Sequence, residues 1–209
     1  MVKYILFDLD NTLYSVRHGL DDIFRVRLRE YCSGFLGVPP AEYDLLREEG
    51  VRRYGTTVGW LRGEHNFTDV EGYFAHIHPE DEVDCLGPDR ELRHFIENLP
   101  CPSSILTNSP RFHADRTLKK LELEGLFEEI FDIVGNNFLG KPHATAYQRA
   151  LDALSLRPEE TLFIDDMPAY AEAFVNLGGQ GLLIDELDTY PNYPHKRIKD
   201  LREIGDILT

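Results

Sequence analysis

A short hydrophobic run near the start of the chain leads directly into acidic residues. Residues 4–7 (YILF) are followed by Asp8, Leu9 and Asp10, and then by turn-forming residues up to Thr12. An apolar run that ends in turn-forming residues predicts a short interior strand followed by a loop. Because alternate residues of a strand share a face, we expect Asp8 and Asp10 to project to the same side at its carboxyl end.

The hydrophobic pattern after Thr12 has the spacing of helices. Residues 21–35, 40–54 and 69–76 are predicted helices, and residues 55–63 form a loop or a short broken helix. From about residue 88 the pattern alternates between helix and strand. The predicted helices there are 90–98, 113–124, 144–154, 169–177 and 198–207, and the predicted strands are 103–108, 130–134, 161–165 and 181–184.

Repeated strand–helix units predict an α/β fold with a Rossmann-like parallel sheet covered on both faces. The first strand is separated from the others by about seventy residues of helical pattern. We therefore expect a helical cap, residues 15–87, inserted after the first strand. Residues 1–14 and 88–209 would then form the core.

Composition narrows the class of partner. The chain has 209 residues, of which 42% are hydrophobic and 28% charged, and its net charge is −15. These fractions are ordinary for a globular protein. A surplus of negative charge argues against a nucleic-acid polymer or an anionic membrane as partner. A small anionic substrate stays compatible with the sequence if the pocket supplies local positive charge.

Cysteine usage and the start of the chain suggest a compartment. Cys32, Cys85 and Cys101 are scattered and odd in number, which is typical of reduced thiols. Met1 leads directly into the first predicted strand and leaves no room for a signal peptide. No apolar stretch approaches the length that crosses a bilayer. We therefore expect a cytoplasmic protein.

Polar residues also lie at the ends of two predicted strands and just before a predicted helix in the alternating half of the chain. Thr107 and Asn108 end one strand just before a helix, where backbone N–H groups and the helix dipole hold anions. Lys141 precedes a proline at the mouth of a further helix. Asp165 and Asp166 end another strand. Ligands of open parallel sheets bind at the carboxyl ends of the strands, so these groups are expected to converge.

The expected cluster has the composition of a magnesium–phosphate site. Neighbouring carboxylates repel each other, and a bound cation, a shared proton or a division into nucleophile and acid/base would each account for them. Asp8, Asp165 and Asp166 make an oxygen-rich site suited to Mg²⁺, while Thr107 and Lys141 complete a phosphate cradle.

Phosphoryl transfer assigns different tasks to the first two acids. Asp8 would attack phosphorus and form an aspartyl-phosphate. Asp10 would protonate the leaving oxygen and later activate water. The substrate would be a small phosphorylated metabolite.

These motifs resemble those of the haloacid dehalogenase superfamily. Its phosphatases carry D-x-D-x-T, then a Ser/Thr at a strand end, then a lysine and a pair of acids. The resemblance implies that Thr107, Asn108 and Lys141 bind phosphate, and that Mg²⁺ is held by Asp8, Asp165, Asp166 and the backbone carbonyl of Asp10. Dehalogenase members lack the second acid of the first motif, so Asp10 points to phosphate chemistry. The matching residues are Asp8, Asp10, Thr12, Thr107, Lys141, Asp165 and Asp166.

Within that superfamily the chain is most similar to the pyrimidine 5′-nucleotidase branch, on residues 7–14, 54–59, 107–109 and 163–166. Two positions depart from the branch: Trp60 replaces a usual leucine, and Tyr170 replaces a common asparagine. The resemblance implies hydrolysis of nucleoside 5′-monophosphates. Candidate specificity residues are Tyr14, Tyr54, Thr56, Thr57 and Trp60.

Other hypotheses stay open from the sequence. The same core would serve a sugar-phosphate or phosphoglycolate phosphatase, or a phosphomutase, because the core contacts only the phosphate. A non-catalytic binding domain is a third hypothesis, since function does not follow from fold. Trp60 would either stack on a base or pack between cap and core. His76 and His78 lack an evident companion for a zinc site and are interpreted as surface histidines.

Overall fold

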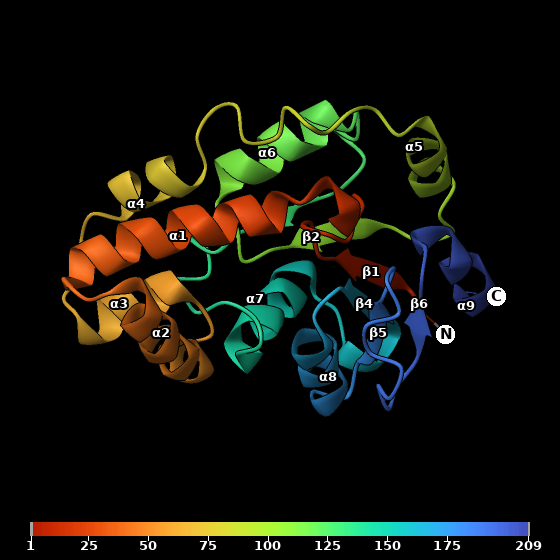
Figure 1. Cartoon of the computed structure of the whole chain (residues 1–209). Helices are drawn as coiled ribbons and strands as arrows, with labels where there is room; N and C mark the ends of the chain where they lie inside the picture. The colour runs from red at the N-terminus through yellow and green to blue at the C-terminus, as the bar shows by residue number, and fades with distance from the viewer. Residues whose placement is uncertain (1, 209) are drawn as a thin grey trace.

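The computed structural model describes residues 2–208, and a parallel sheet forms its centre (Figure 1). Within these residues the sheet has six strands in the order β3-β2-β1-β4-β5-β6, and every neighbouring pair is parallel. The strands are β1 (Tyr4–Phe7), β2 (Ser103–Leu106), β3 (Ile130–Phe131), β4 (Thr161–Asp165), β5 (Gln180–Ile184) and β6 (Arg197–Ile198). The first strand therefore lies in the middle, with β2 on one side and β4 on the other.

Helices cover both faces of the sheet. Figure 1 shows α5 and α6 above it and α7 and α8 below it. The alternation of side chains along β1 accounts for both layers. Ile5 and Phe7 belong to the hydrophobic cluster that contains residues of α5 and α6. Tyr4 and Leu6 belong to a second cluster, with residues of α7 and α8. The core helices are α5 (Arg90–Glu97), α6 (Arg111–Lys120), α7 (Ala144–Leu154), α8 (Pro168–Asn176) and α9 (Gly205–Leu208).

Four of the helices between β1 and β2 share a hydrophobic cluster that is separate from those of the sheet. They are α1 (Leu20–Leu36), α2 (Pro40–Tyr54), α3 (Thr57–Glu64) and α4 (Val70–Ile77). Their cluster includes Leu28, Tyr43 and Trp60. Val83 and Leu86, by contrast, pack in the cluster of the sheet. We therefore propose that the cap ends near the end of α4, before residue 87.

Three elements differ from the sequence predictions. The strand predicted over 130–134 is limited to Ile130–Phe131. Residues 57–64 form a regular helix, α3, in which the Thr56 hydroxyl accepts a hydrogen bond from the Gly59 N–H at the N-terminus. The predicted closing helix 198–207 is wrong in its first part. Ile198 lies in β6 and pairs with Ile184, and short helical turns follow at Leu201–Ile204 and Gly205–Leu208. Pairing with β5 outweighs the local helical pattern there.

The remaining sequence expectations concern thiols and membrane segments. Cys32, Cys85 and Cys101 are all free. Among the described residues, no helix combines the length and the apolar character that crossing a bilayer requires.

Candidate active site

The carboxyl ends of three adjacent strands bring the predicted residues together. Asp8 follows β1, Asp165 is the last residue of β4, and Thr107 follows β2. Strands β1 and β4 are paired in register, with Phe7 opposite Ile164, so their acidic ends lie side by side. Thr107 is buried at the end of β2, and its hydroxyl accepts a hydrogen bond from the N–H of Ser109. Residues far apart in the sequence thus meet at one edge of the sheet.

Lys141 links the two buried acids. Its ammonium lies 2.6 Å from Oδ1 of Asp8 and 2.6 Å from Oδ2 of Asp165. Only 1% of the Lys141 side chain is exposed, so neither ion pair is screened by bulk water. The backbone of Lys141 is in turn held by the side-chain amide of Asn108. Asn108 therefore fixes the segment that carries the ammonium group.

The acids of this site carry more negative charge than Lys141 neutralises. Burial and repulsion from Asp165 and Asp10 raise the pKa of Asp8 to about 7, despite the ammonium of Lys141. Burial and the charges of Asp165 and Asp8 raise the pKa of Asp166 to about 9. The pKa of Lys141 is raised in turn, because the attraction of both acids exceeds the effect of its burial. A further cation would therefore be electrostatically favourable here.

The donor set fits a magnesium ion. Asp8, Asp165 and Asp166 each offer a carboxylate oxygen, and these atoms all lie within 4.8 Å of one another. Hard oxygen ligands are those that Mg²⁺ prefers in proteins. Among the described residues, the carboxylate of Asp166 accepts only a long hydrogen bond of 3.4 Å from Asn11. The Asp10 carbonyl stays a predicted ligand.

Asp10 has a different environment from the other acids. Its Oδ1 accepts hydrogen bonds from the Tyr14 hydroxyl and from Nε2 of His113, both at 2.7 Å. Its Oδ2 accepts one from the Ser109 hydroxyl at 2.6 Å. Desolvation opposes the ionisation of Asp10, but the charge and hydrogen bond of His113 outweigh it and lower its pKa well below the usual range. The surroundings of Asp10 and Asp8 thus shift the pKa values of the two carboxyl groups in opposite directions.

His113 is a site residue that sequence reasoning missed. It lies on α6, four residues after Ser109, and is buried. Burial lowers the pKa of a histidine, but Asp10 and Glu82 together raise that of His113 to about 10. Ser109 lies outside α6, which begins at Arg111 after the N-cap Pro110. The contact of His113 with Asp10 is tertiary, and no local pattern in the sequence indicates it.

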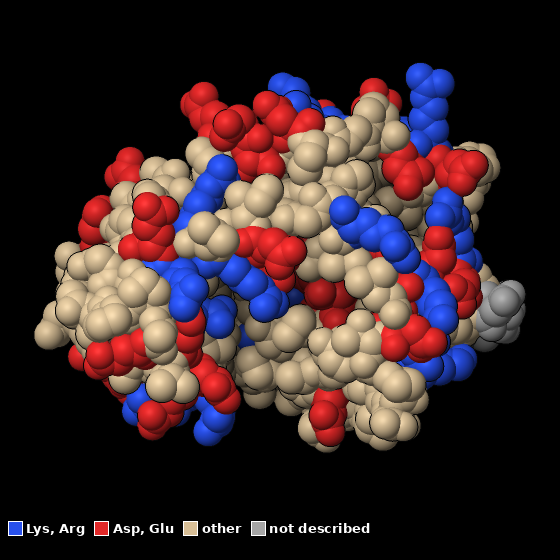
Figure 2. Space-filling view, viewed as in Figure 1, with Lys and Arg blue, Asp and Glu red and all other residues tan. Residues whose placement is uncertain are grey.

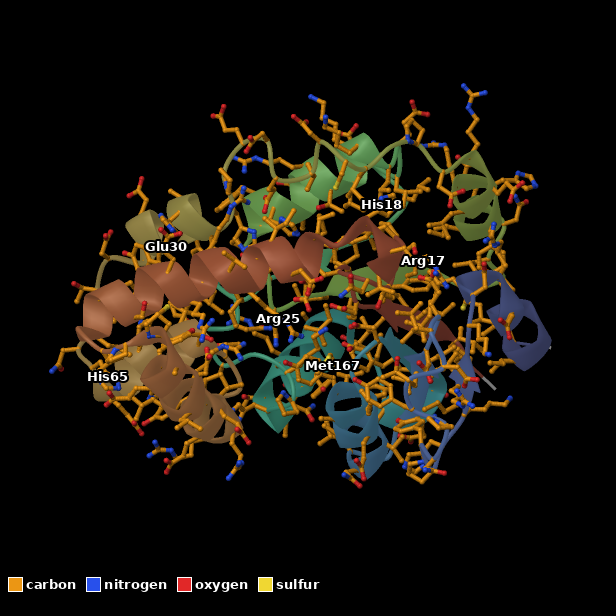
Figure 3. All side chains as sticks on the ribbon, in the orientation of Figure 1. Arg17, His18, Arg25, Glu30, His65 and Met167 are labelled. Atoms are coloured by element: carbon orange, nitrogen blue, oxygen red, sulfur yellow. The ribbon has the colours of Figure 1, made fainter. Side chains whose placement is uncertain are left out.

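A cavity of about 220 Å³ opens above these residues and extends to the cap. Asp8, Asp10, Thr107, Lys141 and Asp166 line one side of it. Figure 2 shows a hollow near the middle of the face, between the cap helices and the core, where basic and acidic side chains meet. In Figure 3, Arg25 on α1 and Met167 before α8 lie on opposite sides of this hollow, and both line the cavity.

The structure brings only some of the predicted specificity residues to this region. Thr56 and Thr57 line the cavity. Tyr14 lies beside it as a hydrogen-bond donor to Asp10. Tyr54 and Trp60 do not line the cavity. Trp60 is 2% exposed, packs within the cap cluster and donates from Nε1 to Glu64, so no face of its indole is available for stacking on a substrate.

The two histidines that were interpreted as surface residues differ in burial. His76 is exposed on α4, as expected. His78 is buried, and its Nδ1 lies 2.6 Å from Oε2 of Glu82. The expectation of a surface position is therefore wrong for His78. The segment after α4 folds back onto α6, and the sequence pattern does not indicate that contact.

Two known proteins are similar to this chain over most of its length. Phosphate metabolism protein 8 of Saccharomyces cerevisiae is 27% identical over 229 residues, which cover 99% of this chain and 70% of that protein. Validoxylamine A 7′-phosphate phosphatase of Streptomyces hygroscopicus subsp. limoneus is 27% identical over 179 residues, or 81% of this chain and 79% of that protein.

The fold has solved counterparts. A haloacid dehalogenase-like family hydrolase from Streptococcus pneumoniae superposes with a TM-score of 0.64 at 20% identity, over 100% of this chain and 99% of that one. The family model of the haloacid dehalogenase-like hydrolases matches residues 2–178. That match spans β1, the inserted helices, Lys141 and β4, and so includes every element of the acidic site. The chain belongs to the haloacid dehalogenase-like hydrolases.

Proposed function

We propose that this protein is a Mg²⁺-dependent phosphatase of small phosphate monoesters that works through an aspartyl-phosphate on Asp8. The observation that carries the proposal is the ammonium of Lys141, 2.6 Å from both Asp8 and Asp165 at the wall of the cavity. A buried cation between two acids is placed to attract a phosphate group while leaving carboxylate oxygen available for attack. The phosphatase named among the relatives supports this reaction class.

Asp8 is the proposed nucleophile. One carboxylate oxygen forms a bond to phosphorus while the bond from phosphorus to the ester oxygen breaks, and the ester oxygen leaves as an alcohol after taking up a proton. Lys141 and the hydroxyl of Thr107 are placed to stabilise the charge on the phosphoryl oxygens. Water then attacks the same phosphorus, which frees inorganic phosphate and restores the Asp8 carboxylate.

Asp10 is the proposed proton carrier for both halves of the reaction. About 31% of its side chain is exposed, so a substrate in the cavity can reach it. As an ionised carboxylate it is ready to accept the proton of the attacking water. Asp10 then gives this proton to the leaving oxygen of the next ester, so the proton balance closes over one cycle. The Nε2 atom of His113 lies 2.7 Å from Oδ1 of Asp10.

Asp8, Asp165 and Asp166 are the residues proposed to hold Mg²⁺, together with the Asp10 carbonyl. The chemistry expected of the bound ion is neutralisation and orientation of the substrate phosphate. Asp165 is also fixed by the N–H of Met167, at 2.8 Å from its Oδ1. This hydrogen bond leaves the carboxylate of Asp165 in one orientation before an ion arrives.

A nucleoside 5′-monophosphate is the proposed substrate class, with a pyrimidine base as the specific hypothesis. The cap side of the cavity carries aromatic side chains, of which the half-buried Phe24 offers surface for a planar base. Arg25 and Arg47 line the same wall. Arg47 is anchored by a 3.0 Å hydrogen bond from its Nε to the Thr57 hydroxyl, so its remaining N–H donors face a defined direction.

A sugar-like phosphate is the second candidate. Thr56, Thr57 and Arg47 give the cap wall hydrogen-bonding groups that match hydroxyl-rich leaving groups as well as nucleosides. The relative named as a validoxylamine A 7′-phosphate phosphatase also supports this class.

Release of phosphate from a panel of esters tests both proposals. Purified protein with excess MgCl₂ is assayed on UMP, CMP, a hexose phosphate and phosphoglycolate. We expect the highest kcat/KM on UMP or CMP. A higher value on the hexose phosphate would move the assignment to the second class. Absence of turnover on every ester, with intact folded protein, would overturn the phosphatase proposal and favour a binding domain.

A further inference from the structure

Behind Asp10, a chain of hydrogen bonds passes through His113 and Glu82 to His78, which also lines the cavity. His113 Nε2 contacts Asp10 at 2.7 Å, and His113 Nδ1 contacts Oε1 of Glu82 at 2.8 Å. The other oxygen of Glu82 lies 2.6 Å from Nδ1 of His78. The side chains of His78, Glu82 and His113 are 4%, 7% and 4% exposed. These three side chains are therefore largely shielded from solvent, whereas Asp10 is not.

The imidazole of His113 is held on both sides. A carboxylate accepts at each ring nitrogen, and ionised carboxylates only accept hydrogen bonds, so both nitrogens donate. Two such bonds fix the plane of the ring as well as its position. Glu82 is itself fixed, because His78 donates to its second oxygen and the Arg116 guanidinium lies 3.6 Å away.

The same three side chains have the composition of a metal site. One ligand atom each of His78, Glu82 and His113 lies within 4.8 Å of the others. The local charges favour an ion network instead. Arg116 already brings a positive charge to Glu82, and both nitrogens of His113 donate to carboxylates and leave no lone pair for a cation.

We propose, resting on the proposed phosphatase activity, that His113 is a positioning residue for Asp10 and that Glu82 is its anchor. Only Asp10 is exposed enough to meet a substrate, so His113 and Glu82 act through it. Their task is to hold the Asp10 carboxylate in the direction from which it exchanges a proton with the leaving oxygen.

Glu82 also connects Asp10, through His113, to the segment that follows the cap helix α4. His78 follows α4 directly, as its C-cap residue, and Glu82 lies in the segment that leads from α4 back to the core. The rings of His78 and His113 are 4.6 Å apart between centroids. The orientation of the proton carrier therefore depends on contacts with the chain where it leaves the cap as well as on β1.

Comparing esters with different leaving groups distinguishes the positioning of Asp10 from a purely structural role of His113. In the first step the bond from Asp8 to phosphorus forms, the phosphorus–oxygen bond of the ester breaks, and the released oxygen takes a proton from Asp10. An alkyl oxygen needs that proton, whereas a 4-nitrophenyl oxygen leaves as a stable anion. Misplacing Asp10 therefore slows the alkyl ester selectively.

Benzyl phosphate and 4-nitrophenyl phosphate are matched probes, because both carry one aromatic ring and differ in the leaving oxygen. Their kcat/KM values are measured with excess MgCl₂ for wild type, His113→Ala and His113→Gln. We expect His113→Ala to lose about 10- to 100-fold more on benzyl phosphate than on 4-nitrophenyl phosphate. His113→Gln should recover part of that difference, since its amide can donate to Asp10.

Two further variants complete the test. Glu82→Gln keeps the side-chain volume. It should also reduce kcat/KM more on benzyl phosphate than on 4-nitrophenyl phosphate, but by a smaller factor than His113→Ala. If His113→Ala does not fold, Glu82→Gln alone tests the proposal. His76→Gln, exposed on α4, is the matched control and should change neither ester. Equal losses on both esters in His113→Ala and Glu82→Gln would overturn the positioning role. Failure of the wild type on both esters and on the metabolite panel would instead overturn the proposed function.

Discussion

Asn108 and Lys141 hold each other through two hydrogen bonds. The backbone N–H of Lys141 donates to Oδ1 of Asn108 at 2.8 Å, and Nδ2 of Asn108 donates to the Lys141 carbonyl at 2.9 Å. Gly140, just before the lysine, lies so close that an added Cβ would be 2.3 Å from Oδ1 of Asn108. The loop that carries the ammonium group is therefore fastened to the end of β2.

Replacing Asn108 by alanine should impair catalysis although Lys141 is still present. The variant leaves a backbone donor and acceptor unpaired, at a cost of about 1–3 kcal/mol in unfolding free energy. The displaced ammonium should lower kcat by about 10- to 100-fold. Steady-state kinetics and urea unfolding measure both effects. Asn98→Ala, at the end of α5, is the control. A kcat for Asn108→Ala equal to the wild-type value would contradict the fastening role.

Asp166→Asn should stabilise the metal-free protein and abolish its response to Mg²⁺. The folded-state pKa of Asp166, about 9, is raised above its ordinary value of 3.8. Such a group contributes stability below the unfolded pKa, and that contribution is lost as pH rises toward the folded pKa. At pH 7 in EDTA the variant should be more stable by on the order of 1 kcal/mol or more.

Thermal unfolding of both proteins in EDTA and in MgCl₂ measures this. We expect MgCl₂ to raise the Tm of the wild type and to leave that of Asp166→Asn nearly unchanged. An equal rise of Tm in both proteins would mean that Asp166 takes no part in holding the ion.

Arg47→Ala should weaken substrate binding more than turnover. Arg47 lines the cavity from α2, away from the acids at the strand ends. The loss of its hydrogen bonds to the leaving group should raise KM about tenfold, equivalent to ~1.4 kcal/mol, with little change in kcat. Arg53 lies on the same helix but is paired with Glu64 outside the cavity, so Arg53→Ala is a matched control. Equal KM values for both variants would remove Arg47 from the recognition site.

His113 should make the stability of the protein depend on pH above neutrality. Its pKa is raised from the ordinary value of 6.5 to about 10. The stabilisation is fully present below pH 6.5 and is lost as pH rises through 10. The wild type should therefore exceed His113→Gln by on the order of a few kcal/mol at pH 6.5, with the difference shrinking towards pH 10. Urea unfolding at several pH values checks this. A difference that is constant with pH would contradict a charged His113.

Several elements could be predicted from the sequence because local signals and tertiary packing agree. The helix Pro40–Tyr54 starts with a proline and ends at Gly55, whose φ of 78° suits glycine. The strand Thr161–Asp165 contains the apolar run 162–164 and is buried along its length. The convergence of Asp8 and Asp165 followed from the geometry of a parallel sheet, in which all carboxyl ends lie at one edge.

Contacts between distant side chains could not be predicted in this way. Trp60 packs onto Gly50, where an added Cβ would be 2.3 Å from its indole, and hydrophobic spacing does not specify which helix faces which. Nothing local in the sequence joins His78, Glu82 and His113, because the segment after α4 must first fold against α6. The two-residue strand β6 likewise depends on its pairing with β5.

Trapping the phosphoryl group on Asp8 tests the central claim most directly. Protein turning over its best phosphate ester is quenched in acid, digested at low pH, and the peptide that contains Asp8 is examined by mass spectrometry. We expect a phosphorylated Asp8 in the wild type, and in Asp8→Asn neither that species nor turnover, with kcat lower by on the order of 10³-fold or more. Substantial turnover by Asp8→Asn, or phosphate on a different residue, would contradict the account.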